Sequence, residues 1–218
     1  FIGSYTLGAG QFCTKPGLLF VPADSEIPRI LTERQQAGAY PAQPLLNERI
    51  RAGFDATLTT LQAHDGVEPL ALPLKDEGEP GPVLLVTTIA AVLADPESLL
   101  EECFGPCALV VTYDDETQLL DVADLLPGQL TAIVVGQDDD EIAPQLVEAA
   151  AEHAGRVLWN QWPTGVSVTD AQQHGGPYPA TTAPSTTSVG AAAIGRFLRP
   201  VAYQGFLQAL LPALLRDA

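Results

Sequence analysis

A single cysteine lies at the centre of a glycine-bracketed segment, GAGQFCTKPG at residues 8–17, and has the clearest potential for chemistry. Glycines beside Cys13 and the nearby Pro16 allow a tight loop in which backbone N–H groups converge on a reacting atom. A thiol in such a loop is a candidate nucleophile with an oxyanion site beside it. The alternative is a buried structural cysteine. No histidine stands next to Cys13 in the sequence to activate it.

A second motif, EECFGP at residues 101–106, combines carboxylates, an aromatic ring and a Gly-Pro turn between a predicted helix and a predicted strand. One interpretation is a helix C-terminus closed by Gly-Pro. The other is a ligand clamp, in which Glu102 accepts hydrogen bonds from sugar hydroxyls and Phe104 packs on a flat ring. The pattern alone leaves both interpretations open.

Short apolar runs alternate with helical patterns, and the runs at 108–112, 131–135 and 156–159 predict a βαβαβ region. Uniformly apolar strands are typical of a parallel sheet that is covered on both faces. We therefore predict an α/β fold with three layers, in which a twisted, mostly parallel sheet has helices on both faces. The other predicted elements are strands at 18–21, 70–72 and 83–88, and helices at 1–9, 27–37, 45–63, 97–103, 116–126 and 141–154.

The net charge of −17 argues against nucleic acids and anionic membranes as partners, because such a surface repels phosphate groups. The longest apolar stretch, residues 83–94, is too short to span a bilayer, which needs about 20 residues. The acidic run at 138–141 is expected to cap the helix that follows it. Because this run has no scaffold of further ligands, we predict no metal site there.

The other two cysteines, Cys103 and Cys107, have no histidine or cysteine companions at zinc-binding spacing. We therefore predict that they are core residues without chemistry. Three thiols without paired spacing fit a reducing compartment, so we expect a cytoplasmic protein.

Three further patterns stand out in order along the chain: GQFC at 10–13, ECFGP at 102–106, and the run 160–203 with HGG at 174–176 and TTSVG at 186–190. These three patches resemble the aldehyde dehydrogenase superfamily. The segments FCTKPG at 12–17 and HGGPYPATT at 174–182 are most similar to bacterial fatty aldehyde and α-ketoglutaric semialdehyde (2,5-dioxopentanoate) dehydrogenases. The resemblance covers essentially the whole chain, and it implies that residues 1–218 are the catalytic domain and that the nucleotide-binding domain lies upstream.

The resemblance implies that Cys13 is the nucleophile, which attacks an aldehyde to give a thiohemiacetal. Hydride then passes to a nicotinamide, and water releases the acid from the thioester. The backbone N–H of Cys13 would form half of the oxyanion hole. The family's general-base glutamate and its oxyanion asparagine lie upstream of the cysteine, outside this sequence.

Further site residues follow from the same resemblance. Glu102 matches the carboxylate that binds the nicotinamide ribose, and Phe104 matches the aromatic ring that lines this pocket. Phe12, Thr14 and His174 match positions beside the aldehyde channel. For His174, the alternative is a loop residue that is hydrogen-bonded to the backbone.

The resemblance thus implies NAD(P)-dependent oxidation of an aldehyde to a carboxylic acid in the full-length enzyme. NAD or NADP would be bound mostly by the upstream domain, so we expect the fragment alone to be inactive. We expect the full-length enzyme to be a homo-oligomer. The alternatives are an acyl-phosphate reductase on the same scaffold and a truncated, non-catalytic paralogue that acts as a structural partner.

Overall fold

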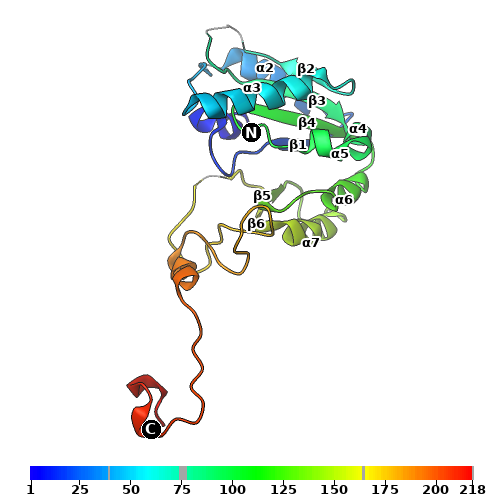
Figure 1. The fold of residues 1–218 in the computed structure, drawn as a ribbon. Helices are drawn as coiled ribbons and strands as arrows, with labels where there is room; N and C mark the ends of the chain where they lie inside the picture. The colour runs from blue at the N-terminus through cyan, green and yellow to red at the C-terminus, as the bar shows by residue number, and fades with distance from the viewer. Residues whose placement is uncertain (39, 74–77, 164, 218) are drawn as a thin grey trace.

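A four-stranded sheet in the order β1-β4-β3-β2 forms the centre of the computed structural model (Figure 1), which describes residues 1–38, 40–73, 78–163 and 165–217. Three strands run parallel, namely β1 (Leu18–Pro22), β4 (Cys107–Tyr113) and β3 (Val83–Thr88). The edge strand β2 (Glu68–Ala71) runs antiparallel to β3. The predicted α/β class with a mostly parallel sheet is therefore confirmed.

Two apolar cores lie on the two faces of this sheet, which gives the predicted three layers. Successive strand residues alternate between the faces: Leu84 and Val110 belong to one core, and Leu85 and Leu109 belong to the other. The first core is covered by α1 (Ile2–Tyr5) and α2 (Ile27–Ala37). The second core is covered by α3 (Glu48–Ala63), α4 (Ile89–Ala94), α5 (Pro96–Leu99) and α6 (Gln118–Ala123).

The last two strands, β5 (Gln129–Val134) and β6 (Ala154–Trp159), form a separate parallel pair joined by α7 (Ala143–His153). The predicted βαβαβ region is thus divided between two sheets. Both hydrogen-bonding edges of β4 are already used by β1 and β3, so β5 cannot pair with it. A cavity of about 920 Å³ lies between β1 and β5.

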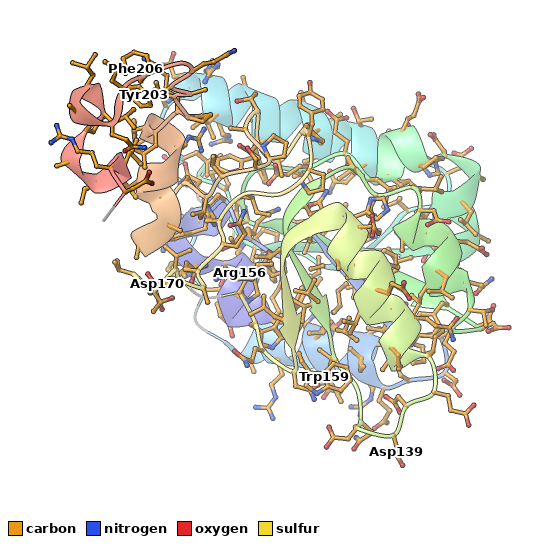
Figure 2. All side chains as sticks on the ribbon, turned by 90° about the horizontal axis from the view of Figure 1, so that it is seen from below. Asp139, Arg156, Trp159, Asp170, Tyr203 and Phe206 are labelled. Atoms are coloured by element: carbon orange, nitrogen blue, oxygen red, sulfur yellow. The ribbon has the colours of Figure 1, made fainter. Side chains whose placement is uncertain are left out.

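The C-terminal segment extends away from both sheets (Figure 1), with three short 3₁₀ helices along it. Figure 2 labels Tyr203 and Phe206, whose rings meet edge to face with centroids 5.5 Å apart. The helices are η2 (Ala191–Phe197), η3 (Gln208–Leu210) and η4 (Ala213–Leu215). Between residues 191 and 217 the exposed apolar side chains are Ile194, Phe197, Leu198, Val201, Tyr203, Phe206, Leu207, Leu210, Leu214 and Leu215.

Three local predictions were wrong. The predicted helix over residues 97–103 ends at Leu99, before the EECFGP motif. The predicted helix over residues 1–9 ends at Tyr5, because the chain then turns into a left-handed conformation at Gly8 and Ala9. The acidic run at 138–141 does not cap α7, since Ile142 is the N-cap and has no side-chain cap. Instead, the Asp140 carboxylate accepts a hydrogen bond from the backbone N–H of Gln137. None of the described helices is long and apolar enough to cross a membrane.

Candidate active site

The Cys13 loop leaves α1 through three consecutive residues with positive φ, namely Gly8 at 55°, Ala9 at 56° and Gly10 at 67°. This conformation is accessible to glycine and costly for other residues. It reverses the chain tightly and leaves Cys13 as an exposed free thiol. The predicted glycine-shaped loop is therefore present, and the alternative of a buried structural cysteine does not apply to Cys13.

Gly10 packs directly on the Gly-Pro turn of the second motif. A Cβ atom built on Gly10 would lie 2.1 Å from the carbonyl oxygen of Gly105 and 2.6 Å from the nitrogen of Pro106. Real Cβ atoms do not approach backbone this closely, so only glycine fits. The two motifs, which are far apart in the sequence, are thus in backbone contact in the fold.

Lys15 provides a second connection between these motifs, and sequence reasoning missed it. Its ammonium group is buried, and Nζ donates hydrogen bonds to the carbonyl oxygens of Cys103 at 2.8 Å and Cys107 at 2.9 Å. Burial lowers the pKa of Lys15 below its usual value of 10.5. An isolated lysine two residues after a cysteine has no motif that would reveal this role.

The predicted cofactor residues share a cavity with Cys13, the predicted nucleophile. Glu102 is exposed, Phe104 is half-buried, and both line the cavity of about 920 Å³ together with Cys13 and Thr14. Phe12 is exposed and does not line this cavity; a Cβ atom on Gly8 would lie 2.6 Å from its ring. The structure thus brings four of the six predicted site residues to one cavity.

His174 lies against Cys13, the predicted nucleophile, at a sequence separation of 161 residues. Its Nε2 atom is 3.3 Å from Sγ of Cys13, which is hydrogen-bonding distance for sulfur. The resemblance placed this residue beside the aldehyde channel, and the sequence showed no activating histidine near Cys13. The fold brings a histidine from the distant C-terminal run to this thiol.

The backbone around His174 is fixed by the TTSVG motif. The His174 N–H donates to Oγ1 of Thr187 at 2.9 Å, and the His174 carbonyl accepts from N and Oγ of Ser188 at 3.0 and 2.9 Å. Thr187 is 3% exposed, and its hydroxyl also donates to the carbonyl of Val189 at 2.8 Å. These contacts fix the backbone of His174, from which the imidazole reaches Cys13.

Two glycines after the histidine press its loop against the second sheet. Gly176 has a φ of 142°, and a Cβ atom there would lie 2.4 Å from the carbonyl oxygen of Gln129 at the start of β5. A Cβ atom on Gly155 in β6 would lie 2.3 Å from the carbonyl oxygen of Gly175. The loop that carries His174 therefore packs on the β5–β6 pair, and this contact fixes the position of the loop.

The electrostatic surroundings favour a neutral imidazole. Burial, followed by the positive charge of Arg156, lowers the pKa of His174 below 6.5. Among the described residues, Nδ1 of His174 is buried and has no hydrogen-bond partner, and the same holds for Nε and Nη2 of Arg156. Arg156 belongs to β6 and is labelled in Figure 2.

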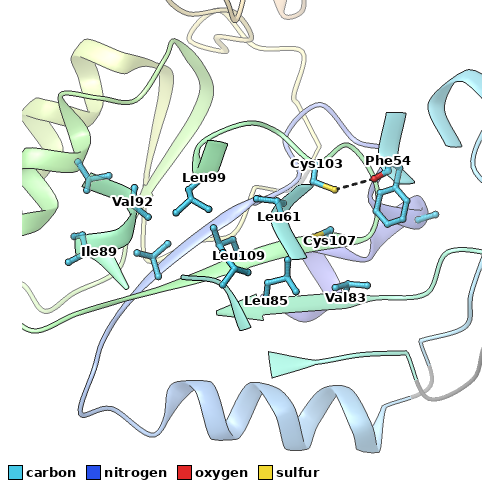
Figure 3. Close-up of a cluster of buried hydrophobic side chains, with 14 of the residues drawn as sticks. Phe54, Leu61, Val83, Leu85, Ile89, Val92, Leu99, Cys103, Cys107 and Leu109 are labelled. Atoms are coloured by element: carbon cyan, nitrogen blue, oxygen red, sulfur yellow. Dashed lines mark hydrogen bonds between the residues drawn. The ribbon is translucent and has the colours of Figure 1, made fainter. Parts of the chain in front are cut away.

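Cys103 and Cys107 are core residues, as predicted. They are 6% and 1% exposed, and both belong to the core beside α3. Figure 3 shows the Sγ of Cys103 directed at the carbonyl oxygen of Phe54, at a distance of 3.9 Å. Both cysteines contact the candidate site through their backbone carbonyl groups, which accept hydrogen bonds from Lys15, and not through their thiols.

The residues present fit the nicotinamide end of a dinucleotide. Glu102 offers an accessible carboxylate for the two hydroxyls of a ribose, and Phe104 offers an aromatic face on the same cavity as the thiol. The described residues thus place an exposed thiol, an imidazole nitrogen beside it and an accessible carboxylate on one α/β scaffold.

Comparison with known proteins identifies the family. Residues 1–178 match the model of the aldehyde dehydrogenase family, and the chain belongs to this family. It is 39% identical over 222 residues to the alpha-ketoglutaric semialdehyde dehydrogenase of Acinetobacter baylyi, covering 99% of this chain. It is 40% identical over 222 residues to alpha-ketoglutaric semialdehyde dehydrogenase 2 of Azospirillum brasilense, covering 100% of this chain. The chain spans 42% of the length of each relative.

Solved structures agree on the fold. One is the NAD⁺ complex of an aldehyde dehydrogenase from Bacillus cereus, with a TM-score of 0.69 and 16% sequence identity. The match covers 88% of this chain and 39% of that one. The family model and the two relatives confirm the family expected from the three patches.

Proposed function

We propose that this chain carries the nucleophile of an aldehyde dehydrogenase, and that the full-length enzyme oxidises an aldehyde to a carboxylic acid with NAD or NADP. The observation that carries the proposal is the exposed Cys13 thiol, which shares a cavity with Glu102 and Phe104. Family membership and the two semialdehyde dehydrogenases at about 40% identity support it. The nucleotide-binding domain would lie upstream of this chain.

Each site residue then has a distinct task. Cys13 attacks the carbonyl carbon, and its backbone N–H donates to the oxygen that becomes negatively charged. Glu102 and Phe104 would hold the ribose and nicotinamide of the cofactor, which supplies a hydride acceptor when bound. Thr14 lines the cavity beside the thiol. The carbon–sulfur bond breaks again when water releases the acid.

For the substrate, we propose a semialdehyde of a 2-oxo dicarboxylic acid, the class that both relatives are named for. The test is steady-state NAD(P)H formation by the full-length enzyme with α-ketoglutaric semialdehyde and with an unbranched fatty aldehyde. A higher kcat/KM for the semialdehyde supports the proposal. A clear preference for the fatty aldehyde contradicts this substrate class, and no oxidation of either contradicts the proposed function.

We also propose that the full-length enzyme is a homo-oligomer. The support is the exposed apolar segment at 191–217, which carries three arginines and one aspartate in a chain of net charge −17. Apolar exposure on this scale marks an interaction site, and the basic segment complements an acidic surface. Light scattering of the full-length enzyme with and without this segment tests the proposal, and an unchanged mass on deletion would contradict it.

A further inference from the structure

Lys15 belongs to two parts of the candidate site at once, through its backbone and through its side chain. Its N–H donates a hydrogen bond to the carbonyl oxygen of Phe12 at 3.0 Å, which closes the turn that carries Cys13. Its Nζ atom donates to the carbonyl oxygens of Cys103 and Cys107 at 2.8 and 2.9 Å. One residue therefore connects the turn that carries the thiol with the backbone of the EECFGP motif.

The segment that Lys15 holds, residues 101–104, has little else to fix its backbone. It lies between α5 and β4 and belongs to neither. Among the hydrogen bonds of the described residues, the one from Lys15 to the carbonyl of Cys103 is the only one that a backbone group of this segment makes. The anchored carbonyl lies between Glu102 and Phe104 along the chain, so Lys15 limits the movement of both.

The ammonium group acts here as a hydrogen-bond donor rather than as an ion-pair partner. Lys15 is buried, and among the described residues it forms no salt bridge. Hydrogen bonds from a charged donor are shorter and stronger than those from a neutral one, so the two carbonyls are held firmly. Burial lowers the pKa of Lys15, and the negative charge of Glu102 acts in the opposite direction. The lysine is thus also coupled electrostatically to the carboxylate whose backbone it anchors.

We propose that Lys15 is a positioning residue for hydride transfer, which fixes Glu102 and Phe104 relative to Cys13. The inference rests on the proposed function, in which Cys13 carries the substrate and the other two residues hold the nicotinamide end of the cofactor. In the transfer, the C–H bond of the Cys13 adduct breaks, the hydride passes to the nicotinamide, and the hydroxyl proton leaves as the thioester carbonyl forms. The rate of this step depends on the separation of the two reacting carbons. Lys15 contacts neither of them and acts through the backbone of the second motif.

Pre-steady-state NAD(P)H formation in the full-length enzyme tests this role. Lys15→Met removes the donors and should slow hydride transfer by about tenfold per titratable Cys13, because the cofactor end of the site is no longer held in place. Lys15→Arg keeps a cation with several N–H donors and should recover most of the rate.

Gln35→Met is the matched control for a general loss of stability. Gln35 is buried on the other face of the sheet, and its Nε2 atom also donates to two backbone carbonyls, those of Ala71 at 3.3 Å and Pro82 at 2.9 Å. The substitution should destabilise the fold in the same way, because two buried carbonyls lose their donor. The rate of hydride transfer per titratable Cys13 should remain that of the unsubstituted enzyme.

A double-mutant cycle with Glu102→Gln separates positioning from a purely structural role. Because Lys15 acts through Glu102 in this proposal, Lys15→Met should slow hydride transfer much less in the Glu102→Gln background than in the unsubstituted enzyme. A purely structural lysine would give the same factor in both backgrounds. If Lys15→Met does not fold, Lys15→Gln replaces it with the same expected results, since its amide nitrogen lies one bond closer to the backbone and falls short of the two carbonyls.

Alkylation of Cys103 provides a readout that needs neither aldehyde nor cofactor. In the 218-residue chain the Cys103 thiol is buried, and its own carbonyl is the one that Lys15 holds, so release of this segment should expose the thiol. Iodoacetamide should therefore label Cys103 about tenfold faster in Lys15→Met than in Gln35→Met, because local opening adds to global unfolding. The labelling of Cys13 should be equal in the two variants.

Equal hydride transfer in Lys15→Met and Gln35→Met would overturn the proposal, as would equal factors in the two backgrounds of the cycle or equal labelling of Cys103 in the two variants. If these tests fail while the full-length enzyme oxidises aldehydes, only the role of Lys15 falls. If the full-length enzyme oxidises no aldehyde, the proposed function falls and takes the role in hydride transfer with it. Faster labelling of Cys103 in Lys15→Met would then leave only the anchoring of residues 101–104 by Lys15.

Discussion

Gly10 and Gly105 are in backbone contact, and this contact joins the nucleophile loop to the carboxylate motif. A Cβ atom on Gly10 would lie 2.1 Å from the carbonyl oxygen of Gly105. Lys15 strengthens the connection by donating to two carbonyls that flank the Gly-Pro turn. The distance between the Cys13 thiol and the Glu102 carboxylate thus depends on this backbone contact.

Replacing Gly10 by alanine should therefore destabilise the fold by about 3 kcal/mol, since the left-handed backbone and the steric overlap both oppose a side chain. The measurement is urea unfolding of both proteins. Gly3→Ala is the control, because a Cβ atom at Gly3 has no heavy atom within 4 Å. Equal stability of Gly10→Ala and the unsubstituted chain would show that the two motifs can separate without cost.

Replacing Lys15 by methionine should destabilise the chain by about 2 kcal/mol at pH 7, because two buried carbonyls lose their donor. The effect should depend on pH. Burial lowers the folded-state pKa of Lys15 below 10.5, so just below pH 10.5 the unfolded chain binds more protons than the folded one. Stability from this group therefore rises with pH. Urea unfolding at pH 7 and 9.5 should show a larger difference between the two proteins at pH 9.5, and a smaller difference would contradict the assignment.

Most of the fold could be predicted from local patterns, because apolar periodicity is a local property. The helix predicted at 27–37 and the strand predicted at 83–88 have the observed bounds. The separate β5–β6 pair was not foreseen, because pairing depends on which strand edges remain free after the whole sheet is formed. Local periodicity contains no information on this choice.

The site was predicted in its parts but not in its connections. Motifs and resemblance predict roles for Cys13 and Glu102, and these roles stay predictions, whereas the contact between Cys13 and His174 joins residues 161 apart. One available signal was the TTSVG run, whose buried Thr187 fixes His174. Its role could not be recognised from the sequence, since a threonine that binds a distant backbone resembles any other polar loop residue.

Among the three cysteines, Cys13 should be the only one that is alkylated quickly. It is exposed, whereas Cys103 and Cys107 are buried in the core beside α3. A thiol must be accessible and deprotonated to react, so core thiols react only through unfolding. Peptide mapping after brief iodoacetamide treatment measures this. Labelling of Cys103 or Cys107 at a rate similar to that of Cys13 would remove the main support for the assignment of the nucleophile.

The chain alone should bind NAD or NADP weakly. Under the proposed function, Glu102 and Phe104 would contact only the nicotinamide end, and the contacts to the rest of the cofactor would belong to the upstream domain. The loss of several kcal/mol of contacts weakens binding tenfold for each ~1.4 kcal/mol. Calorimetry should therefore show no micromolar binding to this chain and tight binding to the full-length enzyme. Micromolar binding to the chain alone would contradict this division of the cofactor site.

In the full-length enzyme, Cys13→Ser and Glu102→Gln should fail at different steps. The serine variant should not oxidise the aldehyde, because a hydroxyl is a far weaker nucleophile near neutral pH even with His174 beside it. Its binding of the cofactor should remain nearly intact.

The glutamine variant should still form the covalent adduct, but a loosened ribose should slow hydride transfer and lower kcat more than it changes KM. Pre-steady-state NAD(P)H formation distinguishes these outcomes. A normal burst in Cys13→Ser would exclude the thiohemiacetal mechanism, and unchanged kinetics in Glu102→Gln would exclude the ribose assignment.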